Sequence, residues 1–268
     1  MRIWLMAARP RTLPAAIAPV LVGTALGVTE VDLRIGGFVA ALLGAIFIQV
    51  GTNLSNDYSD ARRGADTEER LGPVRVTAGG LVPPRQVLVA TYVSFGLAVA
   101  CGAYLVYLAG PILLAIGAAS ILAGVLYTGG PRPYGYEGLG EVFVFLFFGI
   151  VAVTGSYFVQ TMHLIWEAFV LAVPVGLLAA AILLVNNIRD VDTDRRAGKR
   201  TLAVRLGRDG ARALYTVCVL VAFPVIQLVR TRTDGPSLNQ ALANTGLLQL
   251  TFCVLLAGGL LAGPSPGG

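Results

Sequence analysis

Charged residues are scarce in this 268-residue sequence, where they make up 13% of the chain, about half the share that is usual in soluble domains. Histidine occurs once and cysteine three times, and their spacing matches neither a metal site nor a disulfide framework. Apolar residues, in contrast, make up 56% of the chain, and the mean hydropathy is +0.75. This composition excludes a disordered chain, a secreted disulfide scaffold and an ordinary cytosolic enzyme.

The apolar residues form long continuous runs, each close to the roughly 20 residues that a helix needs to cross a bilayer. The runs lack the polar–apolar alternation of a membrane β-barrel, and helices satisfy their own backbone polar groups in lipid. The sequence therefore predicts one all-α polytopic membrane protein with about eight transmembrane helices. The expected spans are residues 12–29, 36–54, 86–107, 109–128, 139–160, 166–187, 212–229 and 246–262.

All but one of the 20 basic residues are arginines, and most of them lie in three segments, 1–11, 55–85 and 188–212. Because positive charge stays on the cytoplasmic side, we expect a multi-pass protein of the cell membrane. Its N-terminus and the three basic segments would face the cytoplasm. This orientation accounts for the net charge of +5 without nucleic acid as a partner.

Two similar polar segments follow the second and the sixth expected spans, at residues 53–66 and 186–200. In both, an apolar helix runs into asparagine, then spaced aspartates, then arginines and a glycine. Such an internal repeat is common in membrane folds and places the site between the repeats. We therefore expect a single domain over 1–268 with two quasi-repeated halves, about 1–128 and 129–262.

Helical periodicity of about 100° per residue aligns the polar residues of each segment on one face. Those faces consist of Asn53, Asn56, Asp57 and Asp60 in the first segment and of Asn187, Asp190 and Asp194 in the second. Two facing rows of carboxylates repel each other unless a cation lies between them, and oxygen ligands of this kind suit Mg²⁺. Neighbouring arginines are bidentate partners for phosphate. The pattern predicts a site for a metal-bound diphosphate at the cytoplasmic helix ends.

Three other interpretations remain open from the residues alone. The first is a pair of solvated helix ends with i,i+4 acid–base pairs. The second is a cation transporter, although a transporter is expected to place its carboxylates near the bilayer midplane. The third is a CDP-alcohol phosphotransferase, which carries its paired aspartates within one short motif, whereas the two segments here lie far apart in the chain.

Several motifs together carry a resemblance to a known family. They are Asn56-Asp57-x-x-Asp60 with a later Asp66, Asp190-x-x-x-Asp194, and the stretches RPRTLP at 9–14, GPVRVTAGGL at 72–81, YTGGPRP at 127–133 and GLGE at 138–141. This set resembles the UbiA superfamily of intramembrane aromatic prenyltransferases, and in particular the branch that acts on a dihydroxynaphthoate. The resemblance covers about residues 5–262.

The resemblance implies a fold and a reaction. Members of this family form a bundle of usually nine transmembrane helices and use Mg²⁺ to bind a polyprenyl diphosphate. In the naphthoate branch, the polyprenyl group is transferred to 1,4-dihydroxy-2-naphthoate with loss of CO₂ and diphosphate, giving demethylmenaquinone for menaquinone biosynthesis. Another aromatic acceptor, such as 4-hydroxybenzoate or homogentisate, stays open within the same family.

The resemblance also implies roles for individual residues. The expected metal ligands are Asn53, Asn56, Asp57, Asp60, Asp66, Asp190 and Asp194. The diphosphate would contact Arg63, Arg132, Arg189, Lys199 and Arg200. The residues expected at the reacting groups are Asp60, Asp190, Asp194, Tyr127 and Arg132. Aromatic faces that could stabilise an allylic cation are Tyr58, Tyr134, Tyr136 and Phe143.

The C-terminal part departs from the family pattern. We expect about eight spans where the family usually has nine. A span over 212–229 would also place Arg230 and Arg232 on the outer side, against the positive-inside rule. Both acidic segments precede this region, so the predicted site does not depend on it.

Overall fold

The computed structural model describes residues 2–65, 71–220 and 235–262, and within these ranges the chain forms helices and no strand. Its elements are α1 (Arg2–Ala8), η1 (Pro10–Thr12), α2 (Leu13–Val28), α3 (Ile35–Arg62), α4 (Pro84–Ala109), α5 (Ile112–Leu126), η2 (Tyr134–Glu137), α6 (Gly140–Val144), η3 (Phe145–Val151), α7 (Ala152–Thr161), α8 (Trp166–Arg196), α9 (Leu202–Cys218) and α11 (Gly235–Ala262).

Six helical stretches of the described chain are long and apolar enough to cross a membrane. They are Ile3–Val28, Ile35–Arg62, Pro84–Ala109, Gly140–Thr161, Trp166–Arg196 and Leu238–Ala262, and α5 is a shorter apolar helix. These seven correspond to seven of the expected spans, so the prediction of an all-α multi-pass membrane protein is confirmed. The remaining expected span, 212–229, begins inside α9, which is not among the six. Its later residues, together with Arg230 and Arg232, lie outside the described residues.

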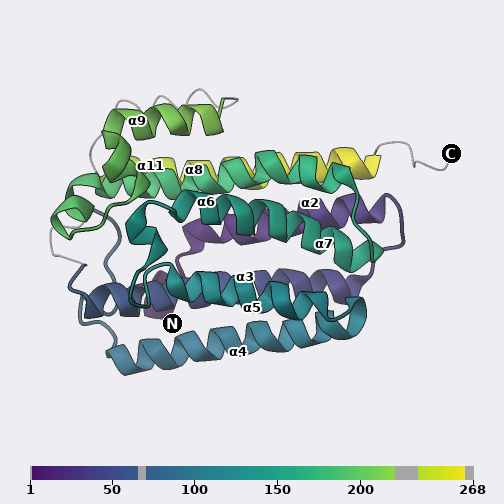
Figure 1. The fold of residues 1–268 in the computed structure, drawn as a ribbon, viewed down its shortest axis with the longest axis horizontal. Coiled ribbons are helices and arrows are strands. Elements are labelled where there is room, and N and C mark those ends of the chain that lie inside the picture. The colour runs from purple at the N-terminus through teal and green to yellow at the C-terminus, as the bar shows by residue number, and fades with distance from the viewer. Residues whose placement is uncertain (1, 66–70, 221–234, 263–268) are drawn as a thin grey trace.

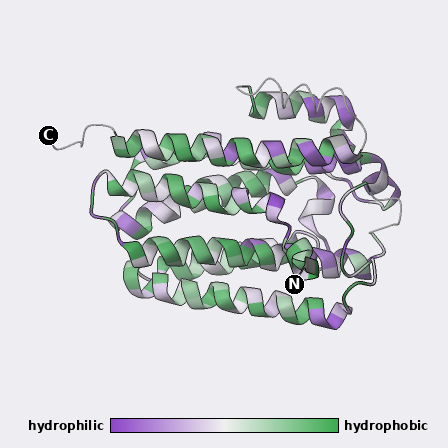
Figure 2. Ribbon diagram, turned by 180° about the vertical axis from the view of Figure 1, so that it is seen from behind, coloured by the Kyte–Doolittle hydropathy of each residue, from purple (hydrophilic) through white to green (hydrophobic). Residues whose placement is uncertain are grey.

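The long helices run side by side as a bundle (Figure 1). α2 contacts α3, α7 and α11, while α8 contacts η3, α9 and α11. α4 and α5 form a hairpin, which turns at Gly110, where a positive φ of 95° suits glycine. Figure 2 shows that hydrophilic residues gather at the end of the bundle where α3 and α8 end, whereas the middle of the long helices is mostly hydrophobic.

α3 and α8 extend beyond the apolar runs and carry the two acidic segments as continuous helix, as the spacing predicts. Both helices end at a glycine with positive φ, Gly64 at 64° and Gly198 at 74°. The residue after each glycine closes the cap in the same way: Ala65 N donates to the Asp60 carbonyl (3.0 Å) and Lys199 N donates to the Asp194 carbonyl (2.9 Å). This is the glycine-ended cap that satisfies the last carbonyls of a helix. The two acidic helices therefore stop at equivalent points of their motifs.

One span contains a π-helical segment where it lies against α8. Gly140–Thr161 passes from α6 through the π-helical η3 into α7. A Cβ on Gly149 of η3 would lie 2.6 Å from the Cα of Gly176 on α8. Small residues allow membrane helices to approach this closely. These two glycines therefore set the distance between η3 and α8 and, with it, the position of the α6 residues that precede η3.

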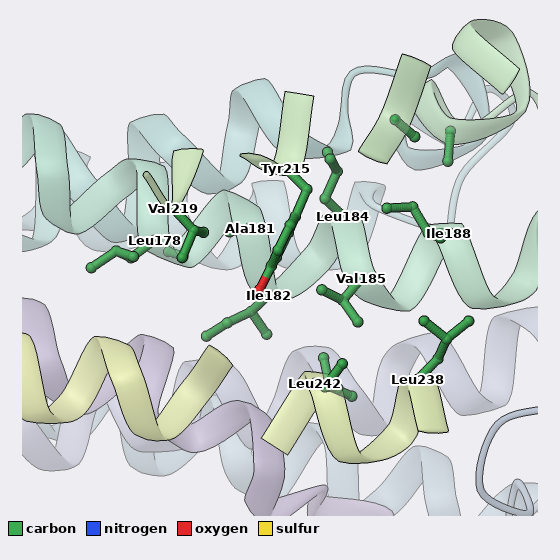
Figure 3. Packing of buried hydrophobic residues seen from close by; sticks show 14 of the residues in the cluster. Leu178, Ala181, Ile182, Leu184, Val185, Ile188, Tyr215, Val219, Leu238 and Leu242 are labelled. Atoms are coloured by element: carbon green, nitrogen blue, oxygen red, sulfur yellow. The ribbon is translucent and has the colours of Figure 1, made fainter. Parts of the chain in front are cut away.

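The largest apolar cluster lies between α8, α9 and α11 (Figure 3). Ile188 of α8, Tyr215 of α9 and Leu238 of α11 are all fully buried within it. α11 begins at Gly235, well before residue 246, where its hydrophobic run begins. Its polar positions before residue 246 have buried partners: Thr245 Oγ1 lies 2.9 Å from the Tyr215 hydroxyl, and Asn239 Oδ1 accepts a hydrogen bond from Arg189 of α8 at 2.7 Å. Satisfied polar groups let the helix continue through a stretch that hydropathy does not mark.

Candidate functional site

A cavity of about 710 Å³ lies inside the bundle between α2, α3, α4, α5, α7 and α8. Its polar end lies at the C-terminal ends of α3 and α8, and its other walls are mainly small or aliphatic residues such as Ala98, Gly102 and Gly117. Of the residues that the sequence predicted for the site, the cavity is lined by Asn53, Asn56, Asp57, Asp60, Tyr127, Arg189, Asp190, Asp194 and Lys199.

Asp60 is the centre of the contacts at the polar end. Its side chain is 2% exposed and accepts a hydrogen bond from the Tyr136 hydroxyl at 2.6 Å. Lys199 Nζ donates to its other oxygen at 3.2 Å, and Arg75 lies 3.7 Å from that same oxygen. Lys199 is also 4.8 Å from the centre of the Tyr136 ring. Two nearly buried cations, Lys199 and Arg75, thus lie beside the Asp60 carboxylate at the wall of the cavity.

Asp57 holds the loop that supplies one of these cations. Its two oxygens accept hydrogen bonds from the backbone amides of Val76 (3.1 Å) and Thr77 (2.9 Å). Because Arg75 directly precedes this pair, the carboxylate fixes the loop so that Arg75 reaches Asp60. The predicted metal-facing row of α3 therefore also fastens the segment 72–81.

The two asparagines of α3 connect other segments to the same site. Asn53 Nδ2 donates to the carbonyl of Ala8 at 2.9 Å and to Thr12 Oγ1 at 3.2 Å. Asn56 Oδ1 accepts a hydrogen bond from Thr128 Oγ1 at 2.8 Å. The N-terminal stretch and the loop after α5 are thereby held against α3.

The second motif is built around a buried arginine. Arg189 is 1% exposed, and its Nε donates to Asp190 Oδ1 at 2.8 Å. The same guanidinium donates to the side-chain oxygens of Asn186 and Asn239, each at 2.7 Å. It therefore neutralises Asp190 from within the bundle and joins α8 to α11. Asp194, half-buried, lines the cavity one turn further along α8.

Three predicted basic residues lie outside the cavity. Arg63, Arg132 and Arg200 are exposed, and none of them lines it. Arg63 donates to the carbonyl of Gly130 and stacks on the Tyr136 ring, with its guanidinium carbon 5.8 Å from the ring centre. These three lie on loops at the polar end of the bundle. The predicted ligand Asp66 lies outside the described residues.

Arg75 and Arg9 line the cavity but are absent from the predicted set, and Tyr136, predicted only as an aromatic face, also lines it. Arg9 donates to the backbone carbonyl of Asn53 at 3.3 Å. A signal for Arg75 is present in the sequence, because it is the one basic residue in the stretch 72–81 that follows the first acidic motif. Nothing in the spacing indicates that the Tyr136 hydroxyl reaches Asp60.

An aromatic wall follows the polar end of the cavity. Tyr134 and Phe143 stack with their ring centres 4.0 Å apart, Tyr127 meets Tyr134 edge-on at 5.5 Å, and Phe147 continues the row 6.2 Å beyond Phe143. All four line the cavity. Burial raises the pKa of Tyr134, so its hydroxyl stays protonated and donates to the Ala123 carbonyl at 2.9 Å. Faces of this kind attract a cation.

The carboxylates fit a metal that arrives with phosphate rather than one held by the protein alone. Within the described parts of the chain, no three histidine, cysteine, aspartate or glutamate side chains lie close enough to hold a metal ion. Mg²⁺ usually takes one or two carboxylates and completes its shell with water and substrate phosphates. Asp60 and Asp190 each face a cationic side chain, Lys199 and Arg189. Such carboxylates are able to accept a metal cation in place of the side-chain charge.

Comparison with known proteins agrees with this architecture. Residues 16–263 match the model of the UbiA prenyltransferase family. The chain is 40% identical to a 1,4-dihydroxy-2-naphthoate octaprenyltransferase of Mycobacterium tuberculosis, over 97% of either chain. It is 41% identical to the Escherichia coli protein of the same name, over 81% of this chain and 72% of that one.

A solved structure shares the fold. A UbiA homolog from Archaeoglobus fulgidus, bound to DMAPP and Mg²⁺, superposes with a TM-score of 0.63 at 16% identity, covering 97% of this chain and 96% of that one. At this identity the likeness concerns the fold alone. The matching family model and the 40% identity to a full-length relative establish more: the chain belongs to the UbiA prenyltransferase family and is a prenyltransferase.

Proposed function

We propose that this protein transfers a polyprenyl group from a polyprenyl diphosphate to 1,4-dihydroxy-2-naphthoate, with Mg²⁺ as cofactor. CO₂ and diphosphate leave, and the product is demethylmenaquinone in its reduced, dihydroxy form, an intermediate of menaquinone biosynthesis. The observation that carries this proposal is one cavity with buried carboxylates and cations at one end and small apolar residues along its length. The relatives named above, which carry this activity in their names, support the choice of acceptor.

The polar end would bind the diphosphate. The proposed Mg²⁺ ligands are Asn53, Asn56, Asp57, Asp60, Asp66, Asp190 and Asp194. When bound, Mg²⁺ would neutralise the diphosphate and make it a better leaving group. Lys199 and Arg75, which face the cavity beside Asp60, supply the same kind of stabilisation from the protein. Arg189 would act mainly by orienting Asp190, to which it donates hydrogen bonds.

The exposed arginines would have a weaker role. Arg63, Arg132 and Arg200 lie on the loops at the polar end, where solvent screens their charge. They would attract the anionic headgroup to the mouth of the site. The direct contacts would come from Lys199 and Arg75 inside it.

The aromatic wall would stabilise the other product of bond cleavage. Positive charge develops on the allylic carbon as the diphosphate leaves, and Tyr134 and Phe143 present ring faces beside the polar end. Tyr127 packs edge-on against Tyr134 in the same wall. Apolar surroundings keep water away from the reactive carbon. The remaining length of the cavity would hold the isoprenoid tail, which is itself lipid-soluble.

The enzyme would lie in the cell membrane with this polar end and its N-terminus at the cytoplasmic face. The charged end of the bundle in Figure 2 and the arginine-rich segments support this orientation. The polyprenyl diphosphate would then bind with its headgroup at the cytoplasmic surface and its tail in the membrane.

The test is a reconstituted assay. Purified protein in detergent would be given Mg²⁺, a polyprenyl diphosphate and 1,4-dihydroxy-2-naphthoate, and prenylated product, CO₂ and diphosphate would be measured. Asp190→Asn should abolish product. Asp192→Asn is the matched control, because Asp192 lies on the same helix but is 69% exposed and pairs with Arg208. Prenylation of 4-hydroxybenzoate or homogentisate in place of the naphthoate would overturn the acceptor and keep the family chemistry.

A further inference from the structure

Glu141 is a buried carboxylate that the reaction as described does not use. It lies in the first turn of α6 and is 5% exposed. Its Oε1 accepts a hydrogen bond from Asn187 Nδ2 at 2.8 Å. Its Oε2 is also buried, and among the described residues this oxygen has no hydrogen-bond partner. Burial of a polar oxygen without a hydrogen-bond partner costs free energy. Glu141 is therefore a candidate for a role beyond packing.

The contact decides which way the Asn187 amide faces. In this contact the asparagine amide donates to the carboxyl oxygen, and an asparagine amide has one donating and one accepting end. Glu141 therefore holds the NH₂ group of Asn187 and turns its carbonyl oxygen the other way. Asn187 lines the cavity, while Glu141 lies behind it. The polar atom that the pair offers to the cavity is thus an acceptor oxygen.

This oxygen lies where a flat ring would fit. Asn187 precedes Asp190 by three positions on α8, about 4.5 Å deeper into the bundle at 1.5 Å per residue. Leu183, one turn deeper still, and the stacked rings of Tyr134 and Phe143 line the same cavity. An apolar and aromatic wall with one polar atom is the usual composition of a site for a small aromatic ligand.

We propose that Glu141 is a positioning residue, which orients Asn187 so that its amide oxygen accepts a hydrogen bond from a ring hydroxyl of the aromatic acceptor. This inference rests on the proposed function and names the acceptor subsite within the cavity. A hydroxyl that donates a hydrogen bond pushes electron density into the ring and makes the attacking carbon more nucleophilic. The subsite would select aromatic acceptors that carry a free hydroxyl beside the carbon to be prenylated.

An exchange of the two side-chain types provides the test. In Glu141→Gln the new amide pairs with Asn187 in either orientation, so the KM for the acceptor should rise about threefold or more while that for the polyprenyl diphosphate stays the same. Asn187→Asp places two buried carboxylates face to face and should be worse. In the double variant, the amide introduced at position 141 donates to the carboxylate introduced at position 187. An acceptor oxygen then faces the cavity again, so the acceptor KM should return to near that of the parent.

Two further measurements separate positioning from a merely structural role. Glu137→Gln is the matched control, because Glu137 lies four positions before Glu141, at the end of η2, and pairs with Arg205 at the surface. Thermal unfolding of Glu141→Gln should match the parent, since its hydrogen bond to Asn187 can still form. An unchanged acceptor KM in Glu141→Gln would overturn the inference. So would an equal rise for both substrates, or a shift in the Mg²⁺ requirement alone.

Equilibrium binding of 1,4-dihydroxy-2-naphthoate, followed by its fluorescence, keeps this inference apart from the proposed function. If the parent bound the acceptor without prenylating it, and the variants showed the same loss and recovery of binding, the subsite would stand and the proposed reaction would fail. If the parent prenylated the naphthoate and the variants bound it equally, the reaction would stand and the role of Glu141 would fail.

Discussion

The contact between Asp60 and Lys199 allows structural and chemical roles of one carboxylate to be separated. Asp60→Asn keeps the shape of the side chain but removes the charge that faces Lys199 and Arg75, whose side chains are each only 9% exposed. Breaking a buried pair by removing one partner costs about 3–5 kcal/mol, because a buried charge loses its partner. At about 2–4 °C per kcal/mol for a chain of this size, the unfolding temperature should fall by roughly 6–20 °C.

The second partner can be removed as well. Lys199→Met in the Asp60→Asn background replaces the pair by neutral side chains of similar length, a change that is often neutral for stability. The unfolding temperature of the double variant should therefore recover a large part of the loss, and the part that remains is due to Arg75, which still faces the neutral side chain at position 60. Prenylation should not return, because in the proposed reaction Asp60 binds Mg²⁺ and an amide is a much weaker ligand for that ion.

The assay pairs scanning fluorimetry in detergent with the prenylation assay on the same preparations. Asp192→Asn again serves as control, since its carboxylate is largely exposed and such surface pairs contribute little. If Asp60→Asn unfolds at the temperature of the parent, the buried pair has no stabilising role. If the double variant regains activity together with stability, Asp60 is a structural anchor only, and its assignment as a metal ligand is refuted.

Three further predictions concern the metal, the tail and the packing of the bundle. Chelation with EDTA should abolish product formation and added Mg²⁺ should restore it; activity that persists in EDTA would contradict the metal requirement. Gly117→Phe should favour short prenyl diphosphates over long ones by about tenfold in kcat/KM. A side chain at position 117 would enter the cavity, and a Cβ there meets nothing within 4 Å. If product analysis shows an unchanged preference for chain length, the isoprenoid tail lies elsewhere. Gly149→Ala should lower the unfolding temperature markedly, since its Cβ would lie 2.6 Å from Gly176 Cα. Gly96→Ala is the control and should not lower it, because a Cβ at position 96 meets nothing within 4 Å. Equal unfolding temperatures for the two variants would refute the close approach of η3 to α8.

The positions of most membrane helices, and the faces that their polar residues occupy, could be predicted from two simple features of the sequence. Apolar runs of bilayer length mark membrane helices, and a repeat of 3.6 residues places Asn53, Asn56, Asp57 and Asp60 on one face of α3. The structure buries all four on that face. The start of α11 could not be found in this way, because polar residues that extend it, Asn239 and Thr245, have partners on α8 and α9. Hydropathy along the chain contains no information about such partners.

The contacts within the site could not be predicted from the sequence for a related reason. Periodicity states which face a residue occupies but not what lies opposite, and a long side chain on that face has many rotamers. Arg189 was expected to bind diphosphate, yet its guanidinium contacts Asp190, Asn186 and Asn239. Asp57 was expected to face the metal, and in the structure its oxygens accept from the amides of Val76 and Thr77. Its role as a ligand remains a proposal.

The two acidic motifs look equivalent in sequence but have different partners in the folded chain. Asp60 and Asp194 occupy the same position in two identical helix caps. The cap of α8, however, leads directly into Lys199, which pairs with Asp60 of α3. The residue that ends the second motif thus neutralises the first, and Arg200, the next residue, donates its amide to the Tyr136 carbonyl at 2.8 Å. Because the motifs are joined in this way, a change in one should perturb the other, and the effects of Asp60 and Asp194 variants should not be additive.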